Sequence, residues 1–133
     1  MATIRKEIPI NAPADQVWDV VRDIGAIHTR FAPGFVLDTR LEEGGAARIV
    51  TFANGVVARE LIVTLDNDAR RLAYTVVGGS ATHHNASFQV FPTPEGNASL
   101  VWITDILPDT VAPGFAGMIE GGASAIKRTL DRH

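Results

Sequence analysis

The sequence of 133 residues contains no cysteine, and its only lysines are Lys6 and Lys127. Without cysteine the chain has no disulfide, no thiol nucleophile and no zinc–thiolate site, and it fits a reducing compartment. The formal net charge is −3 and no basic patch is visible, so the sequence lacks the cationic surface that binds nucleic-acid phosphates. We therefore expect no nucleic-acid partner.

Long apolar runs are missing as well. No apolar segment approaches the roughly 20 residues that span a membrane, and residues 1–10 alternate charged and apolar side chains, unlike a signal peptide. No glycine-rich phosphate loop is present, so nothing supports a nucleotide site. We predict a cytoplasmic protein without stable membrane insertion, without a cofactor and without a metal.

The composition is that of a folded domain. Apolar residues make up 46% of the chain and charged residues 20%, which argues against a disordered chain. A chain of this length can bury a real core. No repeat, linker or low-complexity tract divides it, so we expect one domain over residues 1–133.

Residues 55–87 are the most informative stretch, because they read as strand, Asp-rich turn, strand, Gly-Gly turn and strand. The strands after the Asp-rich turn alternate, with polar side chains on one face, as antiparallel strands with one buried face do. The buried face still carries Tyr74 and His84, and buried polar groups need partners. A sheet that lines a cavity explains both features. The predicted buried face consists of Leu72, Tyr74, Val76, His84, Ala86, Phe88 and Val90.

The rest of the pattern predicts an α+β fold in which a curved, seven-stranded antiparallel sheet wraps around a long C-terminal helix, in the order β-αα-β6-α. The first helix starts at Asn11-Ala12-Pro13, where proline suits the first turn, and a second short helix follows the break at Gly25. In the strand over residues 35–42, we expect Phe35, Leu37, Thr39 and Leu41 on one face. The other strands are predicted over residues 3–10, 48–53, 56–66 and 100–107, with two more that contain Leu72 to Val76 and His84 to Val90. The last helix is predicted over residues 115–130, after a connection that contains Pro113-Gly114.

The strand over residues 56–66 has two candidate inner faces. Hydrophobicity slightly favours burying the face of Arg59, Leu61 and Val63 over the face of Glu60 and Ile62. A β-bulge would let the strand switch faces along its length. If Glu60 points inward, the exposed face with Leu61 and Val63 offers a weak contact between two copies, so we expect a monomer or a weak homodimer.

Several local motifs occur in an order that carries further information. They are Ala12-Pro13-Ala14, residues 17–23, Asn54-Gly55, Glu60 ahead of Leu65-Asp66, Tyr74 through Gly78-Gly79, and the strand of Trp102. This order resembles the helix-grip fold of START-related (SRPBCC) proteins, nearest to the bacterial polyketide cyclase/dehydrase-like group. The resemblance implies a hollow between the sheet and the C-terminal helix that holds a small hydrophobic, lipid-like or polyketide-like molecule.

The resemblance carries over to individual residues only in part. In the related abscisic acid receptors, a glutamate at the spacing of Glu60 faces the ligand, so the resemblance implies that Glu60 points into the hollow. The lysine that pairs with the hormone carboxylate in those receptors has no counterpart in this sequence. Binding of that carboxylate is therefore not implied.

Three functions are compatible with this hollow. The first is binding of a small hydrophobic molecule, with Glu60 as the polar anchor. The second is a cofactor-free cyclase or dehydratase, in which Glu60 and His84 form an acid–base pair and Tyr74 polarises a carbonyl. The third is a protein-interaction module without a ligand, which would require the space to be filled by side chains. The expected ligand-binding residues are Val50, Phe52, Glu60, Ile62, Tyr74, Val76, His84, Ala86, Phe88, Met118 and Gly122.

Each candidate also has a purely structural interpretation. Glu60 could pair with an arginine instead of a histidine, and Tyr74 could be a satisfied core residue. Arg48 and Arg59 could hold an acidic ligand group, although salt-bridged arginines are commoner. Glycine inside a helix costs about 1 kcal/mol relative to alanine. The glycines of the last helix, Gly122 among them, therefore serve either close helix–sheet packing or space for a ligand.

Overall fold

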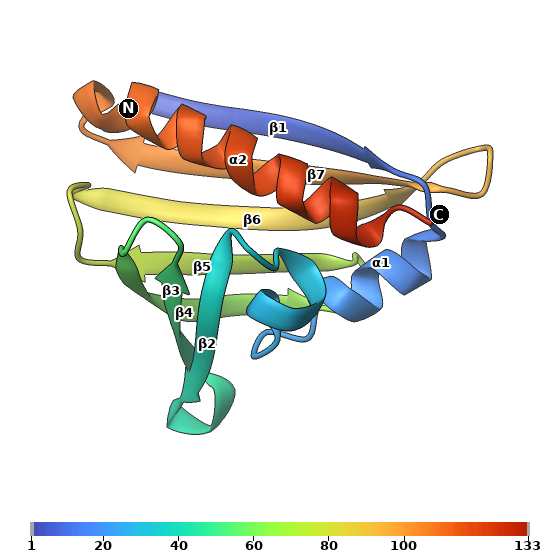
Figure 1. Cartoon of the computed structure of the whole chain (residues 1–133), viewed down its shortest axis with the longest axis horizontal. Helices are drawn as coiled ribbons and strands as arrows, with labels where there is room; N and C mark the ends of the chain where they lie inside the picture. The colour runs from blue at the N-terminus through green and yellow to red at the C-terminus, as the bar shows by residue number, and fades with distance from the viewer. Residues whose placement is uncertain (1, 133) are drawn as a thin grey trace.

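A curved antiparallel sheet of seven strands carries a long helix across its concave face (Figure 1). The computed structural model describes residues 2–132. The strand order is β1-β7-β6-β5-β4-β3-β2, so the first and last strands of the chain pair with each other, and β1 and β2 form the two edges. The strands are β1 (Ala2–Ile10), β2 (Val36–Glu42), β3 (Ala47–Phe52), β4 (Val57–Asp66), β5 (Arg71–Val77), β6 (His83–Pro92) and β7 (Ala98–Leu107).

Two short helices follow β1, and one long helix follows β7. The chain therefore has the predicted α+β helix-grip architecture, and the fold prediction is confirmed. None of the helices in residues 2–132 is long and apolar enough to cross a membrane. The helices are α1 (Ala14–Val21), the π-helical turn η1 (Ile27–Phe31) and α2 (Ala112–Leu130), with 3₁₀ turns η2 (Glu43–Gly45) and η3 (Asp109–Val111).

Helix α1 closes one end of the molecule, next to the C-terminal end of α2 (Figure 1). Val17, Trp18 and Val21 recur at helical spacing and are buried, so one stripe of α1 joins the core. The indole N–H of Trp18 donates a 3.0 Å hydrogen bond to Asn67 in the β4–β5 turn. This bond and the apolar stripe fix α1 against the sheet.

The structure corrects the predicted face of one strand and the predicted start of one helix. Leu37 is 58% exposed, because β2 shifts register against β3 between Val36 and Asp38, and Val36 takes the buried position. The expected common face of Phe35, Leu37, Thr39 and Leu41 is therefore wrong at Leu37. Helix α2 also begins earlier than expected, at Ala112, with Pro113 in the first turn, where the missing proline N–H costs no hydrogen bond.

The inner face of β4 contains Glu60. Ala58, Glu60 and Ile62 face the interior, and a register shift between Ile62 and Thr64 leaves Val63 exposed. After this bulge Leu65 pairs with the buried Leu72. The bulge therefore changes the alternation of the strand, so that Leu65 rather than Thr64 lies on the same face as Glu60, although Leu65 remains 38% exposed.

The interior beneath the middle and C-terminal part of α2 is filled by aromatic rings. The ring of Phe88 lies 5.1 Å from Phe31 and 4.7 Å from Trp102, measured between centroids. Gly122 of α2 is buried against this cluster, and a Cβ atom there would lie 3.0 Å from the Phe35 ring and 3.1 Å from the Trp102 ring. Gly122 therefore permits close helix–sheet packing, and the cluster bounds the inner end of the space under α2.

Candidate functional site

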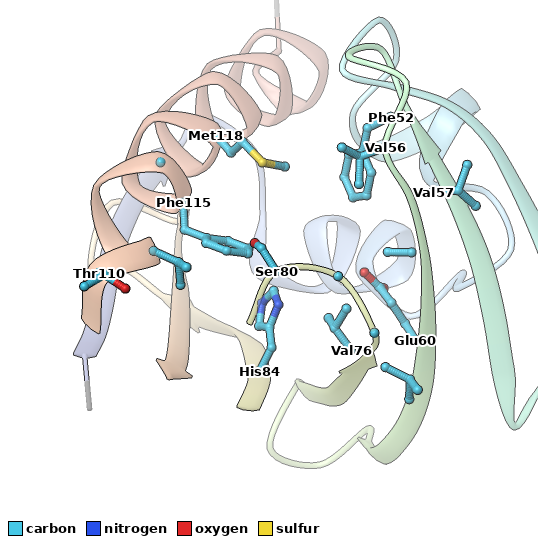
Figure 2. Close-up of a pocket in the computed structure, with 16 residues that line it drawn as sticks. Phe52, Val56, Val57, Glu60, Val76, Ser80, His84, Thr110, Phe115 and Met118 are labelled. Atoms are coloured by element: carbon cyan, nitrogen blue, oxygen red, sulfur yellow. The ribbon is translucent and has the colours of Figure 1, made fainter. Parts of the chain in front are cut away.

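The N-terminal half of α2 covers a cavity of about 590 Å³ (Figure 2). Phe115 and Met118 line the cavity from the helix, and Val76 and His84 line it from the sheet. Phe52 lies across the cavity from Met118 in the same view. The walls are mainly apolar, and the cavity occupies the end of the molecule opposite α1.

Three chain segments surround the mouth of this cavity. They are the β3–β4 hairpin with Val56, the β5–β6 turn with Gly78 and Gly79, and the β7–α2 connection with Thr110. Gly78 and Gly79 have φ angles of +86° and +82°, a conformation that suits glycine, so these residues form the tight turn at the rim. All three segments lie at the same end of the sheet in Figure 1.

Glu60 brings a carboxylate to the cavity wall and pairs with a buried arginine. Arg48 and Glu60 are directly opposite each other in the β3–β4 ladder, and the Arg48 Nε atom donates a 2.8 Å hydrogen bond to Glu60 Oε1. Their side chains are only 4% and 7% exposed. Arg48 also donates to the Ile24 carbonyl at 3.3 Å, and its guanidinium lies 5.1 Å from the centre of the Tyr74 ring. Glu60 thus has the arginine partner that was considered as its structural interpretation.

His84 lies on the same wall as Glu60, at a distance. Glu60 pairs with Val76 across β4 and β5, and the β5–β6 register, with Thr75 opposite Asn85, places His84 beside Val76. Two strand spacings separate the backbones of Glu60 and His84, about 10 Å. Figure 2 shows both side chains directed into the cavity with Val76 between them. They share the cavity, but no direct hydrogen bond joins them.

The His84 ring is partly buried and packs edge-on against Phe115, with the ring centroids 4.9 Å apart. Burial lowers the pKa of His84 below its ordinary value, and the neighbouring His83 lowers it further. The imidazole is therefore neutral at pH 7 and offers the cavity both a donor and an acceptor nitrogen.

Tyr74 lies deeper than Glu60 and His84. Burial raises the pKa of the Tyr74 hydroxyl, and the negative charge of Glu60 raises it further, so the phenol stays protonated. The side chain borders two small inner spaces of about 50 and 60 Å³ rather than the main cavity. A ligand in the main cavity would reach Tyr74 only by entering these spaces.

The predicted ligand-binding residues divide into three groups. Phe52, Glu60, Val76, His84 and Met118 line the main cavity. Val50, Tyr74 and Phe88 border only the small inner spaces. Ile62, Ala86 and Gly122 lie outside the lining of all of these spaces, because the first two pack in the core and Gly122 packs against aromatic rings.

Several residues of the cavity were not predicted. Phe115 lies on the apolar stripe of the predicted C-terminal helix, so that stripe was a usable signal for it. The glycine, serine and threonine residues of the mouth could not be found in the same way, because residues in turns have no periodicity that points inward. The unpredicted mouth residues also include three valines. These unpredicted mouth residues are Val56, Val57, Gly78, Gly79, Ser80, Thr110, Val111 and Gly114.

The remaining charged groups near the site are already paired. Arg59, the other arginine considered for an acidic ligand, makes ion pairs with Glu42 and Glu43, both at 3.3 Å. Within residues 2–132, no group of three or more histidine, aspartate or glutamate side chains is arranged to hold a metal ion.

A family model described as polyketide cyclase / dehydrase and lipid transport matches residues 1–132. Among solved structures, XoxI from Bacillus cereus has a TM-score of 0.87 at 20% identity, over 98% of this chain and 96% of that chain. A Thermobifida fusca protein solved by NMR has a TM-score of 0.75 at 27% identity, over 100% and 98% of the two chains.

Norcoclaurine synthase from Thalictrum flavum, solved in complex with dopamine and hydroxybenzaldehyde, is also similar. Its TM-score is 0.71 at 23% identity, over 96% of this chain and 84% of that chain. The comparison with curated proteins gave no match. The structural likenesses show that this chain and these proteins share a fold.

Proposed function

The chain belongs to the polyketide cyclase / dehydrase and lipid transport family, and on that premise we propose that it binds one small hydrophobic molecule in the cavity under α2. The observation that carries this proposal is the cavity itself. Its volume of about 590 Å³ lies within the roughly 300–1,000 Å³ of typical small-molecule pockets. Its walls are apolar apart from a few polar groups, as such pockets generally are.

A neutral fluorescent probe tests this proposal. N-phenyl-1-naphthylamine is uncharged and largely apolar, with one N–H group, and we expect it to bind with one-to-one stoichiometry and increased emission. Val76→Trp places an indole inside the cavity, so this variant should lose at least about ten-fold in probe affinity because the bulky side chain occupies the probe's space. Thr75→Trp is the matched control, since Thr75 lies on the opposite face of the same strand.

The control distinguishes binding of the probe in the cavity from binding elsewhere on the surface. Thr75→Trp should bind the probe like the wild type. Equal binding by the wild type and Val76→Trp would place the probe elsewhere on the protein and contradict the proposal, provided that both variants melt cooperatively.

Acid–base catalysis in the same cavity is a second candidate function. It is favoured by the neutral imidazole of His84, which can accept a proton near pH 7. Direct transfer between Glu60 and His84 is not available, since they lie two strand spacings apart and no hydrogen bond joins them. A substrate would therefore have to bridge the two groups, as in ring closure or loss of water from a polyketide-like carbonyl compound.

Two substitutions distinguish binding from catalysis. In an acid–base enzyme, His84→Ala and Glu60→Gln should each lower the turnover of a polyketide-like substrate by about 100-fold or more while changing its affinity much less. In a binding protein, the wild type should show affinity without turnover. The protein-interaction alternative requires a filled interior, and the open space beneath the first turns of α2 does not meet that requirement.

A further inference from the structure

The ion pair of Arg48 and Glu60 is oriented with its negative end toward the cavity. Glu60 lines the main cavity, whereas Arg48 borders only a separate inner space of about 60 Å³. The Arg48 guanidinium also has partners on the side away from the cavity, because it donates to the Ile24 carbonyl and lies over the Tyr74 ring. A ligand in the main cavity therefore meets the carboxylate and not the cation.

The Glu60 carboxylate has room for one more hydrogen bond. Its Oε1 atom accepts the bond from Arg48, while its Oε2 atom receives none from residues 2–132. Oε2 is not one of the fully buried polar atoms without a partner, so it is accessible from the cavity. In Figure 2 the carboxyl end of Glu60 points into the open space of the cavity. A donor on a bound molecule would complete the coordination of this carboxylate.

The cavity holds no cation that could receive an acid. Among the residues described as lining it, none is a lysine or an arginine. The only basic group there is His84, which burial keeps neutral at pH 7. A carboxylate brought into this cavity would lose its hydration and would lie near the negative Glu60 without a counter-charge.

We infer that the cavity selects molecules with a hydrogen-bond donor, such as an alcohol or a phenol on an apolar body, and rejects carboxylic acids. The donor binds Glu60 Oε2, and the apolar body lies between Phe115, Met118 and Phe52. This inference rests on the proposed function, because it names the chemical class of the ligand for the same cavity.

Three compounds of nearly equal shape test this selectivity by competition with N-phenyl-1-naphthylamine at pH 7. They are 2-naphthol, naphthalene and 2-naphthoate. We expect 2-naphthol to bind about ten-fold more tightly than naphthalene, because it adds one hydrogen bond to a charged acceptor. We expect 2-naphthoate to bind at least about ten-fold more weakly than 2-naphthol, because its charge is desolvated without a partner.

A variant without the ion pair provides the control. Arg48→Met combined with Glu60→Met replaces both charges by apolar side chains, a change that buried pairs often tolerate. In this double variant, naphthalene should still bind and 2-naphthol should lose its advantage over naphthalene. If the variant does not fold, the ranking of the three compounds on the wild type still decides the question.

Each outcome has one meaning. Tight binding of 2-naphthoate, or equal binding of 2-naphthol and naphthalene to the wild type, overturns the inference and leaves the apolar binding cavity in place. A preference for 2-naphthol that survives in the double variant also overturns it, since the donor would then bind elsewhere. If none of the compounds and no probe binds, both the inference and the proposed function fail.

Discussion

At the scale of single residues, the Arg48–Glu60 pair is the most consequential feature of the interior. Both side chains are almost fully buried and bonded at 2.8 Å. We expect Arg48→Met alone to destabilise the protein by about 3–5 kcal/mol, because it leaves the Glu60 carboxylate buried without a partner. Denaturation by urea, with the free energy of unfolding extrapolated to water, measures this loss.

The same pair can also be replaced as a whole. Arg48→Met with Glu60→Met should recover most of the loss, because two apolar side chains of similar volume require no counter-charge. If Arg48→Met is as stable as the wild type, the ion pair does not contribute to the free energy of unfolding in the way that its geometry indicates. A double variant less stable than the single variant would also contradict this account.

His84 predicts a pH dependence of stability. Its pKa is lowered in the folded state by burial and by His83, so the unfolded chain binds a proton more readily. The free energy of unfolding should therefore be unaffected by His84 above its ordinary pKa of 6.5 and should fall as the pH decreases below that value. Melting temperatures of the wild type and His84→Gln at pH 7.5 and pH 5.5 measure the difference.

The neighbouring histidine is the matched control for this experiment. His83 is exposed, its Nε2 atom donates a 2.6 Å hydrogen bond to Asn85 Oδ1, and it lies one residue away on the opposite face of β6. His84→Gln should lose less stability between the two pH values than the wild type does, whereas His83→Gln should behave more like the wild type. The reverse order would show that the buried ring is not the group responsible.

At the scale of secondary-structure elements, α2 contains two glycines in contrasting surroundings. A Cβ atom on Gly122 would lie about 3 Å from two aromatic rings, whereas one on Gly117 would meet no atom within 4 Å. Gly122→Ala should therefore cost about 1–3 kcal/mol from overpacking against roughly 1 kcal/mol gained in helix propensity. Gly117→Ala should gain up to about 1 kcal/mol.

Thermal unfolding of both variants measures this contrast. We expect the melting temperature of Gly122→Ala to fall and that of Gly117→Ala to rise. A rise for Gly122→Ala would mean that the Phe35 and Trp102 rings move aside easily. In that case Gly122 would mark space available to a ligand, which is the alternative function considered for the helix glycines.

The strands show how much of the fold the sequence could predict. The alternation of Tyr74 and His84 with polar neighbours was sufficient for β5 and β6, because their pairing contains no bulge. It was not sufficient for β2 and β4, because each contains a register shift, at Leu37 and at Val63. A bulge is stabilised by the partner strand, so the periodicity of one strand cannot locate it.

The site was predictable to a similar extent. The inward direction of Glu60 came from a family resemblance, since Leu61 and Val63 made the other face slightly more apolar. The Asn54-Gly55 turn already folds β3 back onto β4, but only the register shows that Arg48 is directly opposite Glu60. The cavity volume was beyond the sequence, because it depends on how α2 packs at Gly122.

At the scale of the whole molecule, the interior has a packed end and an open end. Near α1 the aromatic rings around Phe88 fill the space under α2, while near the β5–β6 turn the same space is a cavity. Segments with few buried contacts open locally at low free energy, so we expect the open end to fluctuate more than the packed end.

Hydrogen exchange with and without 2-naphthol tests this asymmetry. We measure exchange at times shorter than global unfolding takes. In the free protein, exchange should be faster than in α1 for three segments: the β5–β6 turn, the β3–β4 hairpin and the first turns of α2. The ligand should slow exchange in these three segments, because it supplies the contacts that the cavity lacks. Exchange in α1, where Trp18 is hydrogen-bonded to Asn67, should not change. Equal slowing in α1 at short times would mean that the two ends respond as one rigid unit and that the cavity is not the flexible part of the fold.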